Sequence, residues 1–189
     1  NIGVELDENG FIKVDDFCQT QVNNIYAIGD LVRGPMLAHK ASGEGLMVAE
    51  KIAGNDKRVN YGNISFVIYT HPEIAWVGYS EKQALQEGLK VEVGSFPFQA
   101  NGRALTSNQG SGFVKVVVNK EDDSILGVHV IGPSAADVVQ QGLIAMDSNL
   151  SSKQLSSVMF SHPTVSEALH EAVLSARGNA IHLNNRKKK

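Results

Sequence analysis

The sequence predicts an α+β fold in which helices pack on a mostly antiparallel, five-stranded sheet, preceded by a shorter segment of another domain. Three observations predict this class. Five short runs rich in β-branched residues lie between about residues 64 and 183, and the last two are close enough to form a hairpin. Helical segments with apolar stripes lie among these runs. An amphipathic helix buries its stripe, so these helices are expected to pack on the sheet.

The shorter segment comprises residues 1–63. Two extended pieces are predicted there, at 11–14 and 25–28, followed by a helix over 37–53. One face of that helix carries Leu46, Ala49, Ile52 and Ala53. Three small elements cannot enclose a core by themselves, so residues 1–63 are expected to be the remnant of a larger domain in a longer chain.

The domain over residues 64–183 is predicted element by element. Its expected strands are 66–70, 74–78, 90–98, 112–118 and 125–131, the last two joined as a hairpin across 119–124. Reciprocal capping pairs are expected at Ser80 with Gln83, Ser134 with Asp137, Ser151 with Gln154 and Thr164 with Glu167. The apolar stripes are Ala135, Val138, Val139, Gly142, Ala145 and Met146 in one helix, and Val165, Ala168, Leu169, Ala172, Val173 and Ala176 in the last.

Composition excludes several classes of protein. With 42% hydrophobic and 20% charged residues, the chain is typical of an ordinary globular protein, and no run reaches the length of a membrane helix. Its single cysteine, Cys18, cannot form an internal disulfide or a thiolate cluster and suits a reducing compartment. The net charge of -3 gives no nucleic-acid footprint, and the basic residues of 184–189 are expected to form a solvated tail.

Two common site motifs are incomplete. A dinucleotide-binding loop requires a third glycine three residues after a Gly-x-Gly pair. That position is Val48 after the first such pair and Lys115 after the second. His170-Glu171 begins like a zinc-protease helix, but Leu174 occupies the position of the second histidine. Neither a complete nucleotide-binding unit nor a metal site is predicted.

A candidate ligand site lies at Tyr-Ala-Ile-Gly-Asp (26–30) and Gly-Pro-Met-Leu-Ala-His-Lys (34–40). Asp30 follows a glycine that permits close approach of a ligand, and its carboxylate can accept hydrogen bonds from a sugar or polyol hydroxyl. The helix that starts near Leu37 would direct backbone N–H groups at a ligand oxygen. A strand ending in Gly-Asp is also typical of an ordinary turn, so spacing alone leaves both interpretations open.

A candidate catalytic pair lies in Ser-His-Pro-Thr-Val-Ser-Glu (161–167). Pro163 keeps His162 outside the helix, and Thr164 with Glu167 matches a capping box, so Glu167 could simply cap the helix. Alternatively, a carboxylate at this distance holds an imidazole in one tautomer and raises its basicity, as in a general acid/base dyad. Spacing alone does not decide between the two interpretations.

A family resemblance covers nearly the whole chain. The chain resembles the C-terminal part of the dihydrolipoamide dehydrogenase family of flavin disulfide reductases. The resemblance rests on the candidate ligand and catalytic segments described above, together with Tyr-Thr-His-Pro-Glu (69–73), Trp-Val-Gly (76–78) and Ile-Leu-Gly-Val-His (125–129). The resemblance implies a homodimeric, NAD-dependent flavoprotein oxidoreductase that oxidises protein-bound dihydrolipoamide through a redox disulfide and FAD. Its expected partners are the lipoyl domain and acyltransferase core of a 2-oxoacid dehydrogenase complex, in a bacterial cytoplasm.

The resemblance also implies roles for individual residues. His162 would be the acid/base that takes a proton from the dihydrolipoyl thiol, and Glu167 would orient it, serving the flavin of the other subunit. Asp30 would bind the ribityl and pyrophosphate region of FAD. The residues expected to line the flavin are Met36, Leu37, Ala38 and His39. Residues 64–183 would form the dimerisation domain.

The sequence also departs from this family. Its flavin glycine motif, redox cysteine pair and NAD domain are absent from these 189 residues, and Cys18 does not match a redox cysteine. The chain alone is therefore expected to be inactive and to bind no FAD tightly. Two alternatives stay open: a dimerisation module without activity, or the same part of a glutathione or mercuric reductase-like enzyme.

Overall fold

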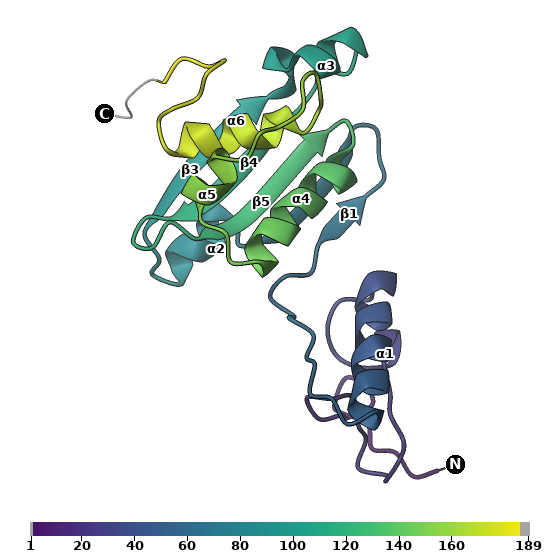
Figure 1. Ribbon diagram of the computed structural model, residues 1–189. Coiled ribbons are helices and arrows are strands. Elements are labelled where there is room, and N and C mark those ends of the chain that lie inside the picture. Colours follow the sequence, from purple (N-terminus) through teal and green to yellow (C-terminus); the bar gives the residue numbers. More distant parts are fainter. Residues whose placement is uncertain (1, 186–189) are drawn as a thin grey trace. The chain divides into compact units, whose positions relative to one another are not determined.

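The computed structural model describes residues 2–185, which divide into two compact units at the boundary between Tyr61 and Gly62. The second unit contains one five-stranded sheet in the order β1-β2-β5-β4-β3, with every neighbouring pair antiparallel (Figure 1). Its strands are β1 (Phe66–Ile68), β2 (Glu73–Gly78), β3 (Val91–Pro97), β4 (Phe113–Asn119) and β5 (Ile125–Gly132). The predicted α+β class and the antiparallel sheet are confirmed.

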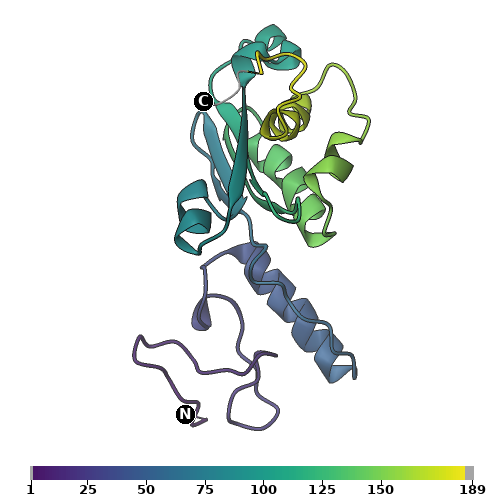
Figure 2. The same ribbon diagram turned by 90° about the vertical axis from the view of Figure 1, so that its left-hand side faces the viewer.

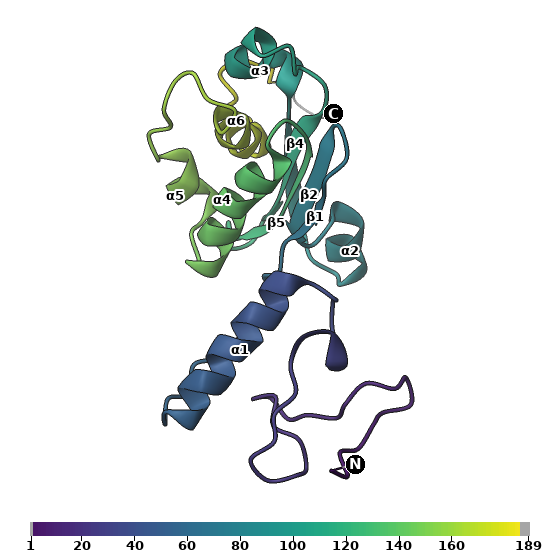
Figure 3. The same cartoon turned by 90° about the vertical axis from the view of Figure 1, so that its right-hand side faces the viewer.

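The long helices of this unit cover one face of the sheet. Helix α4 (Ala135–Asp147) packs on β2 and β5, and α6 (Glu167–Ala176) packs on β3 and β4. Figures 2 and 3 show both on the same side, with α5 (Ser152–Ser156) beside α6 and α2 (Glu81–Gln86) on the opposite side. The remaining short helices of the unit are η2 (Phe98–Ala100) and α3 (Gly102–Thr106).

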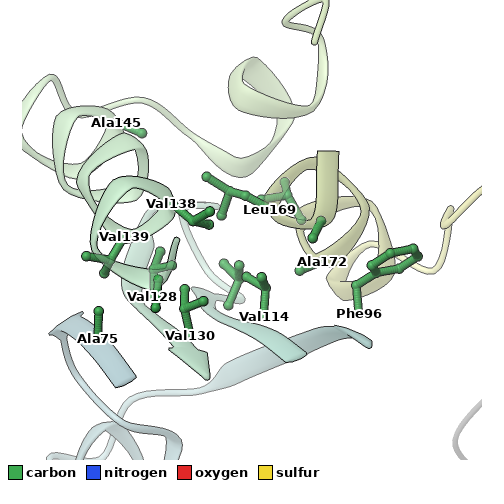
Figure 4. Close-up of a cluster of buried hydrophobic side chains, with 14 of the residues drawn as sticks. Ala75, Phe96, Val114, Val128, Val130, Val138, Val139, Ala145, Leu169 and Ala172 are labelled. Carbon is green, nitrogen blue, oxygen red and sulfur yellow. The ribbon is translucent and has the colours of Figure 1, made fainter. Parts of the chain in front are cut away.

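The core lies between this face and the two helices. Alternate residues of β4 and β5, such as Val114 and Val130, are fully or almost fully buried and meet Val138 of α4 and Leu169 of α6 (Figure 4). The period of two in the strands and the stripe in each helix place these apolar side chains on facing surfaces. Each fully buried side chain of this size contributes roughly 1.5–3 kcal/mol.

Close approach of α6 to the sheet depends on a missing side chain. Gly94 of β3 faces α6, and a Cβ at this position would overlap the backbone of Ala172 and Ala176. Because the obstructing atoms are backbone atoms, they cannot rotate away as a flexible side chain could. Glycine at 94 therefore sets the distance between α6 and the sheet.

Gly94→Ala is expected to lower the free energy of unfolding of the chain by about 1–3 kcal/mol, because the helix must move off the sheet. Gly102→Ala is the matched control, since no atom lies within 4 Å of a Cβ there. Urea unfolding followed by circular dichroism measures both. An equal stability of the two variants would contradict this account of α6 packing.

Two of the predicted capping boxes are confirmed and one is wrong. Ser80 and Ser151 each form a complete box, at the starts of α2 and α5. Ser134 instead adopts a left-handed conformation with φ 52° and makes no side-chain cap. An N-cap hydroxyl reaches the helix from extended backbone, which Ser134 lacks. A carboxylate oxygen of Glu73 accepts from the N–H of Ala136 in its place, at 3.3 Å.

The first unit contains α1 (Ala38–Ile52) and the short turn η1 (Gly29–Leu31). The extended pieces predicted at 11–14 and 25–28 form only isolated bridges, Leu6 to Ile12 and Gln19 to Tyr26. The apolar face predicted for the helix lies exposed, with Leu46 at 66% and Ile52 at 67%. The buried face of α1 carries Lys40, Glu44 and Met47.

Within the part of the chain that the structure describes, no helix is long and apolar enough to cross a membrane. The predicted basic tail falls mainly on residues 186–189, which lie outside the described residues.

Candidate functional site

His162 and Glu167 form a hydrogen-bonded pair at the start of α6. The Nδ1 atom of His162 lies 2.9 Å from Oε1 of Glu167, the first residue of α6. The imidazole is 77% exposed, whereas the carboxylate is 23% exposed. An exposed ring held by a half-buried carboxylate can present its other nitrogen to a substrate.

The second carboxylate oxygen of Glu167 forms one of the two hydrogen bonds of the predicted capping box. The N–H of Thr164 donates to Oε2 of Glu167 at 2.7 Å. The other half is wrong: the hydroxyl of Thr164 donates to the carbonyl of Ser161 at 2.8 Å, and α6 begins only after Ser166. The two interpretations left open by the sequence are therefore compatible, because one carboxylate both fixes the backbone before the helix and holds the imidazole.

The charge of Glu167 is stabilised at this position. Partial burial alone would raise the pKa of Glu167, but hydrogen bonds from the Thr164 N–H and the His162 imidazole lower it overall. An ionised carboxylate only accepts hydrogen bonds, so Nδ1 of His162 carries the proton. The exposed Nε2 of a neutral ring is then a proton acceptor, the state that a general base requires.

A second His–Glu pair lies one turn further along α6 and was missed by the sequence analysis. Glu171 is 3% exposed, and its Oε1 lies 2.7 Å from Nδ1 of His182. Its Oε2 accepts from the N–H groups of Ile181 and His182 at 3.0 and 3.2 Å. Glu171 thereby anchors the segment after α6. The two partners are 11 residues apart, beyond the spacing of helical or capping pairs, so no local pattern indicated the contact.

The neighbouring histidine of α6 has a structural role. Nε2 of His170 lies 2.9 Å from the carbonyl oxygen of Ser156, and its ring stacks on Phe160 with centroids 4.9 Å apart. Over residues 2–185, no group of three or more His, Cys, Asp or Glu side chains could hold a metal ion.

The candidate cofactor segment lies in the first unit. Asp30 is exposed in η1, and within the described chain no hydrogen bond or ion pair to its carboxylate is found. The N-cap of α1 is Leu37, whose side chain cannot accept a hydrogen bond from the first turn. Met36 is 62% exposed, and Ala38 and His39 are exposed beside it. An acceptor carboxylate next to an uncapped helix start fits the hydroxyl and phosphate groups of a dinucleotide.

Two family models match the chain. Residues 64–173 match the dimerisation domain of pyridine nucleotide-disulphide oxidoreductases. The chain belongs to this family. Residues 1–45 match a second model, pyridine nucleotide-disulphide oxidoreductase, so both units have counterparts in proteins of this kind.

Similar proteins carry related names. The chain is 47% identical to the mitochondrial dihydrolipoyl dehydrogenase of Caenorhabditis elegans, over 96% of this chain and 37% of that protein. It is also 47% identical to the dihydrolipoyl dehydrogenase of Cupriavidus necator, over 92% of this chain and 37% of that protein. The chain thus spans little more than a third of the length of these relatives.

Solved structures share the fold. LpdA from Mycobacterium tuberculosis superposes with a TM-score of 0.85 at 24% identity, over 90% of this chain and 38% of that one. The copper complex of the HOCl-induced flavoprotein disulfide reductase RclA from Escherichia coli gives 0.84 at 26% identity, over 90% of this chain and 39% of that one.

The lowered pKa of Glu167 predicts a pH dependence of stability. A carboxylate whose folded-state pKa is depressed stabilises the fold above its unfolded pKa, and this contribution is lost as the pH falls through the folded value. Glu167→Gln is therefore expected to lower the free energy of unfolding at pH 7 by less than about 1 kcal/mol. The difference is expected to shrink as the pH falls below the unfolded value of about 4.3 and to vanish only below the lowered folded pKa. Urea titrations at several pH values measure it. A difference that persists unchanged in acid would contradict the prediction, and Glu87→Gln at an exposed position is the control.

Proposed function

We propose that this chain is the C-terminal part of a dihydrolipoyl dehydrogenase. Such an enzyme oxidises protein-bound dihydrolipoamide, with electrons passing through a redox disulfide and FAD to NAD. The observation that carries the proposal is the His162–Glu167 pair, in which a carboxylate 2.9 Å away orients an exposed imidazole on a dimerisation domain. Relatives that are 47% identical over most of the chain carry the dihydrolipoyl dehydrogenase name.

In this proposal His162 moves a proton at Nε2. The neutral ring accepts the proton of a dihydrolipoyl thiol, which leaves a thiolate able to attack a disulfide. Glu167 keeps the proton of the ring on Nδ1 and stabilises the imidazolium that forms. Thr164 holds the second carboxylate oxygen, so the pair is aligned before substrate arrives.

The first unit would contribute to the cofactor site. FAD, when bound, supplies the acceptor for the electrons of the thiols. Asp30 would accept from ribityl hydroxyls, and the start of α1, with Met36, Leu37, Ala38 and His39, would lie along the flavin. We further propose that residues 1–63 belong to the cofactor domain and residues 64–183 to the interface domain of a homodimer in a bacterial cytoplasm. Its lipoyl partner would belong to a 2-oxoacid dehydrogenase complex.

The test is made in the full-length enzyme by measuring two activities of each variant. His162→Gln is expected to reduce the lipoyl reaction by about 10²- to 10⁴-fold, and Glu167→Gln by a substantial part of that. Electron transfer from NADH to an artificial acceptor bypasses the thiol step and is expected to survive both changes. Equal loss of the two activities, or an unaffected lipoyl reaction in His162→Gln, would show that the proposed role is wrong.

A second candidate function is a dimerisation module without activity; the open face of the sheet supports the dimerisation that both candidates require. Phe66 stacks on Trp76 there with ring centroids 5.1 Å apart, and Phe113 is 37% exposed. A cavity of about 220 Å³ on the same face is lined by Trp76, Phe113 and His129, among others. Exposed apolar surface of this kind is typical of an interface.

The chain by itself is expected to form a symmetric dimer, because a dimerisation domain buries its apolar surface against a second copy. Sedimentation at micromolar concentration measures this, and a monomer would contradict it.

The purified chain is also expected to lose FAD on gel filtration, since the phosphate-binding loop is absent from its sequence. Stoichiometric flavin after the column would contradict this second expectation.

A further inference from the structure

A buried ion pair in α1 has no part in the function proposed above. Nζ of Lys40 lies 3.1 Å from Oε1 of Glu44, and the two side chains are 0% and 1% exposed. Removing two charges from water costs several kcal/mol for each ion, and their mutual attraction offsets this only when further hydrogen bonds satisfy both groups. The other partners of the pair therefore indicate what it does.

Both members of the pair bind the backbone of Gly29. Oε2 of Glu44 accepts from the N–H of Gly29 at 2.7 Å, and Nζ of Lys40 donates to its carbonyl oxygen at 2.9 Å. One peptide donor and one acceptor of a single residue are thus held by opposite charges. Gly29 has φ +69°, and a Cβ there would lie 3.0 Å from the Cβ of Ala41.

Lys40 also contacts the far end of the loop that follows. A Cβ at Gly34 would lie 3.1 Å from Cε of Lys40, so this glycine packs directly on the lysine stem. Gly29 and Gly34 bracket the loop that carries Asp30 and leads into α1. Lys40 therefore contacts both ends of the loop. The conformation of the loop then depends on where the Lys40 ammonium is held.

The carboxylate of Glu44 has one more donor. The hydroxyl of Tyr61 donates to Oε1 at 3.0 Å, which gives Glu44 hydrogen bonds from Gly29 and Tyr61 in addition to its ion pair with Lys40. The bond from Tyr61 stabilises the carboxylate without touching the loop. Tyr61 therefore belongs to the cluster that holds Gly29.

We propose that Lys40 and Glu44 are positioning residues for FAD: they clamp Gly29 and thereby fix the adjacent Asp30 carboxylate and the entry to α1. The inference rests on the proposed function, because it takes Asp30 as the ligand of the flavin nucleotide. Stability alone does not require a buried ion pair here, since well-packed apolar residues often replace one without loss. The two bonds that satisfy this pair both fall on Gly29, the residue before Asp30. A preorganised site loses less free energy on ordering when its ligand binds.

The test uses the full-length protein with the double variant Lys40→Met/Glu44→Gln, which removes both charges and keeps the side-chain shapes. Its dissociation constant for FAD, followed by flavin fluorescence, is expected to rise about tenfold or more, equivalent to about 1.4 kcal/mol. Amide hydrogen exchange of residues 29–31, measured without FAD, is expected to accelerate. Lys51→Met/Asp56→Asn, which removes an exposed ion pair of the same unit, is the matched control and is expected to leave FAD affinity and the exchange of residues 29–31 unchanged.

The outcomes separate this inference from the proposed function. A wild-type protein without FAD affinity would contradict the proposed function, whereas the exchange measurement would still test the clamp. Wild-type FAD affinity in a folded double variant would overturn the inference alone. If the double variant does not fold, Lys40→Arg keeps the charge but places a broader guanidinium at Gly29 and Gly34. Unchanged FAD affinity and exchange in Lys40→Arg would equally overturn the inference.

Discussion

Contact between the backbone of α6 and Gly94 of β3 determines where the candidate catalytic pair lies. The helix sits as close to the sheet as two backbones allow, because any side chain at position 94 would overlap it. Glu167 is the first residue of that helix, so its carboxylate is fixed relative to the core. The hydrogen bond to Glu167 in turn fixes the position of the His162 ring. A packing constraint in the interior is in this way transmitted to an exposed imidazole.

Local patterns in the sequence predicted most of the second unit. The period of two in the strands and the apolar stripes of α4 and α6 are set by burial, which selects residue type strongly at each position. The capping pairs at Ser80 and Ser151 depend only on neighbouring residues and formed as expected. Ser134 did not, because its left-handed backbone keeps its hydroxyl from the helix start, and the residue types of a capping pair give no sign of that conformation.

The parts of the sites that the sequence could not predict depend on contacts beyond the spacing of a helix turn or a cap. Glu171 and His182 are brought together by the return of the chain along α6. Lys40 and Glu44 show the usual spacing of an exposed salt bridge on a helix, which gives no sign that both are buried. Their burial follows from the position of Gly29 beside them, a tertiary property. His162 and Glu167 were predictable as a pair because only a short turn separates them.

The exposed apolar face of α1 has a consequence for how the chain folds during synthesis. Leu46 and Ile52 lie in solvent, and the buried face of the helix is largely occupied by an ion pair. The second unit, by contrast, has a continuous apolar core of its own. Cooperative folding units often coincide with such cores, so we expect the second unit to fold as one cooperative unit. The first unit emerges from the ribosome earlier and buries few apolar side chains among the described residues, chiefly Val32 and Met47, so we expect it to order less cooperatively than the second.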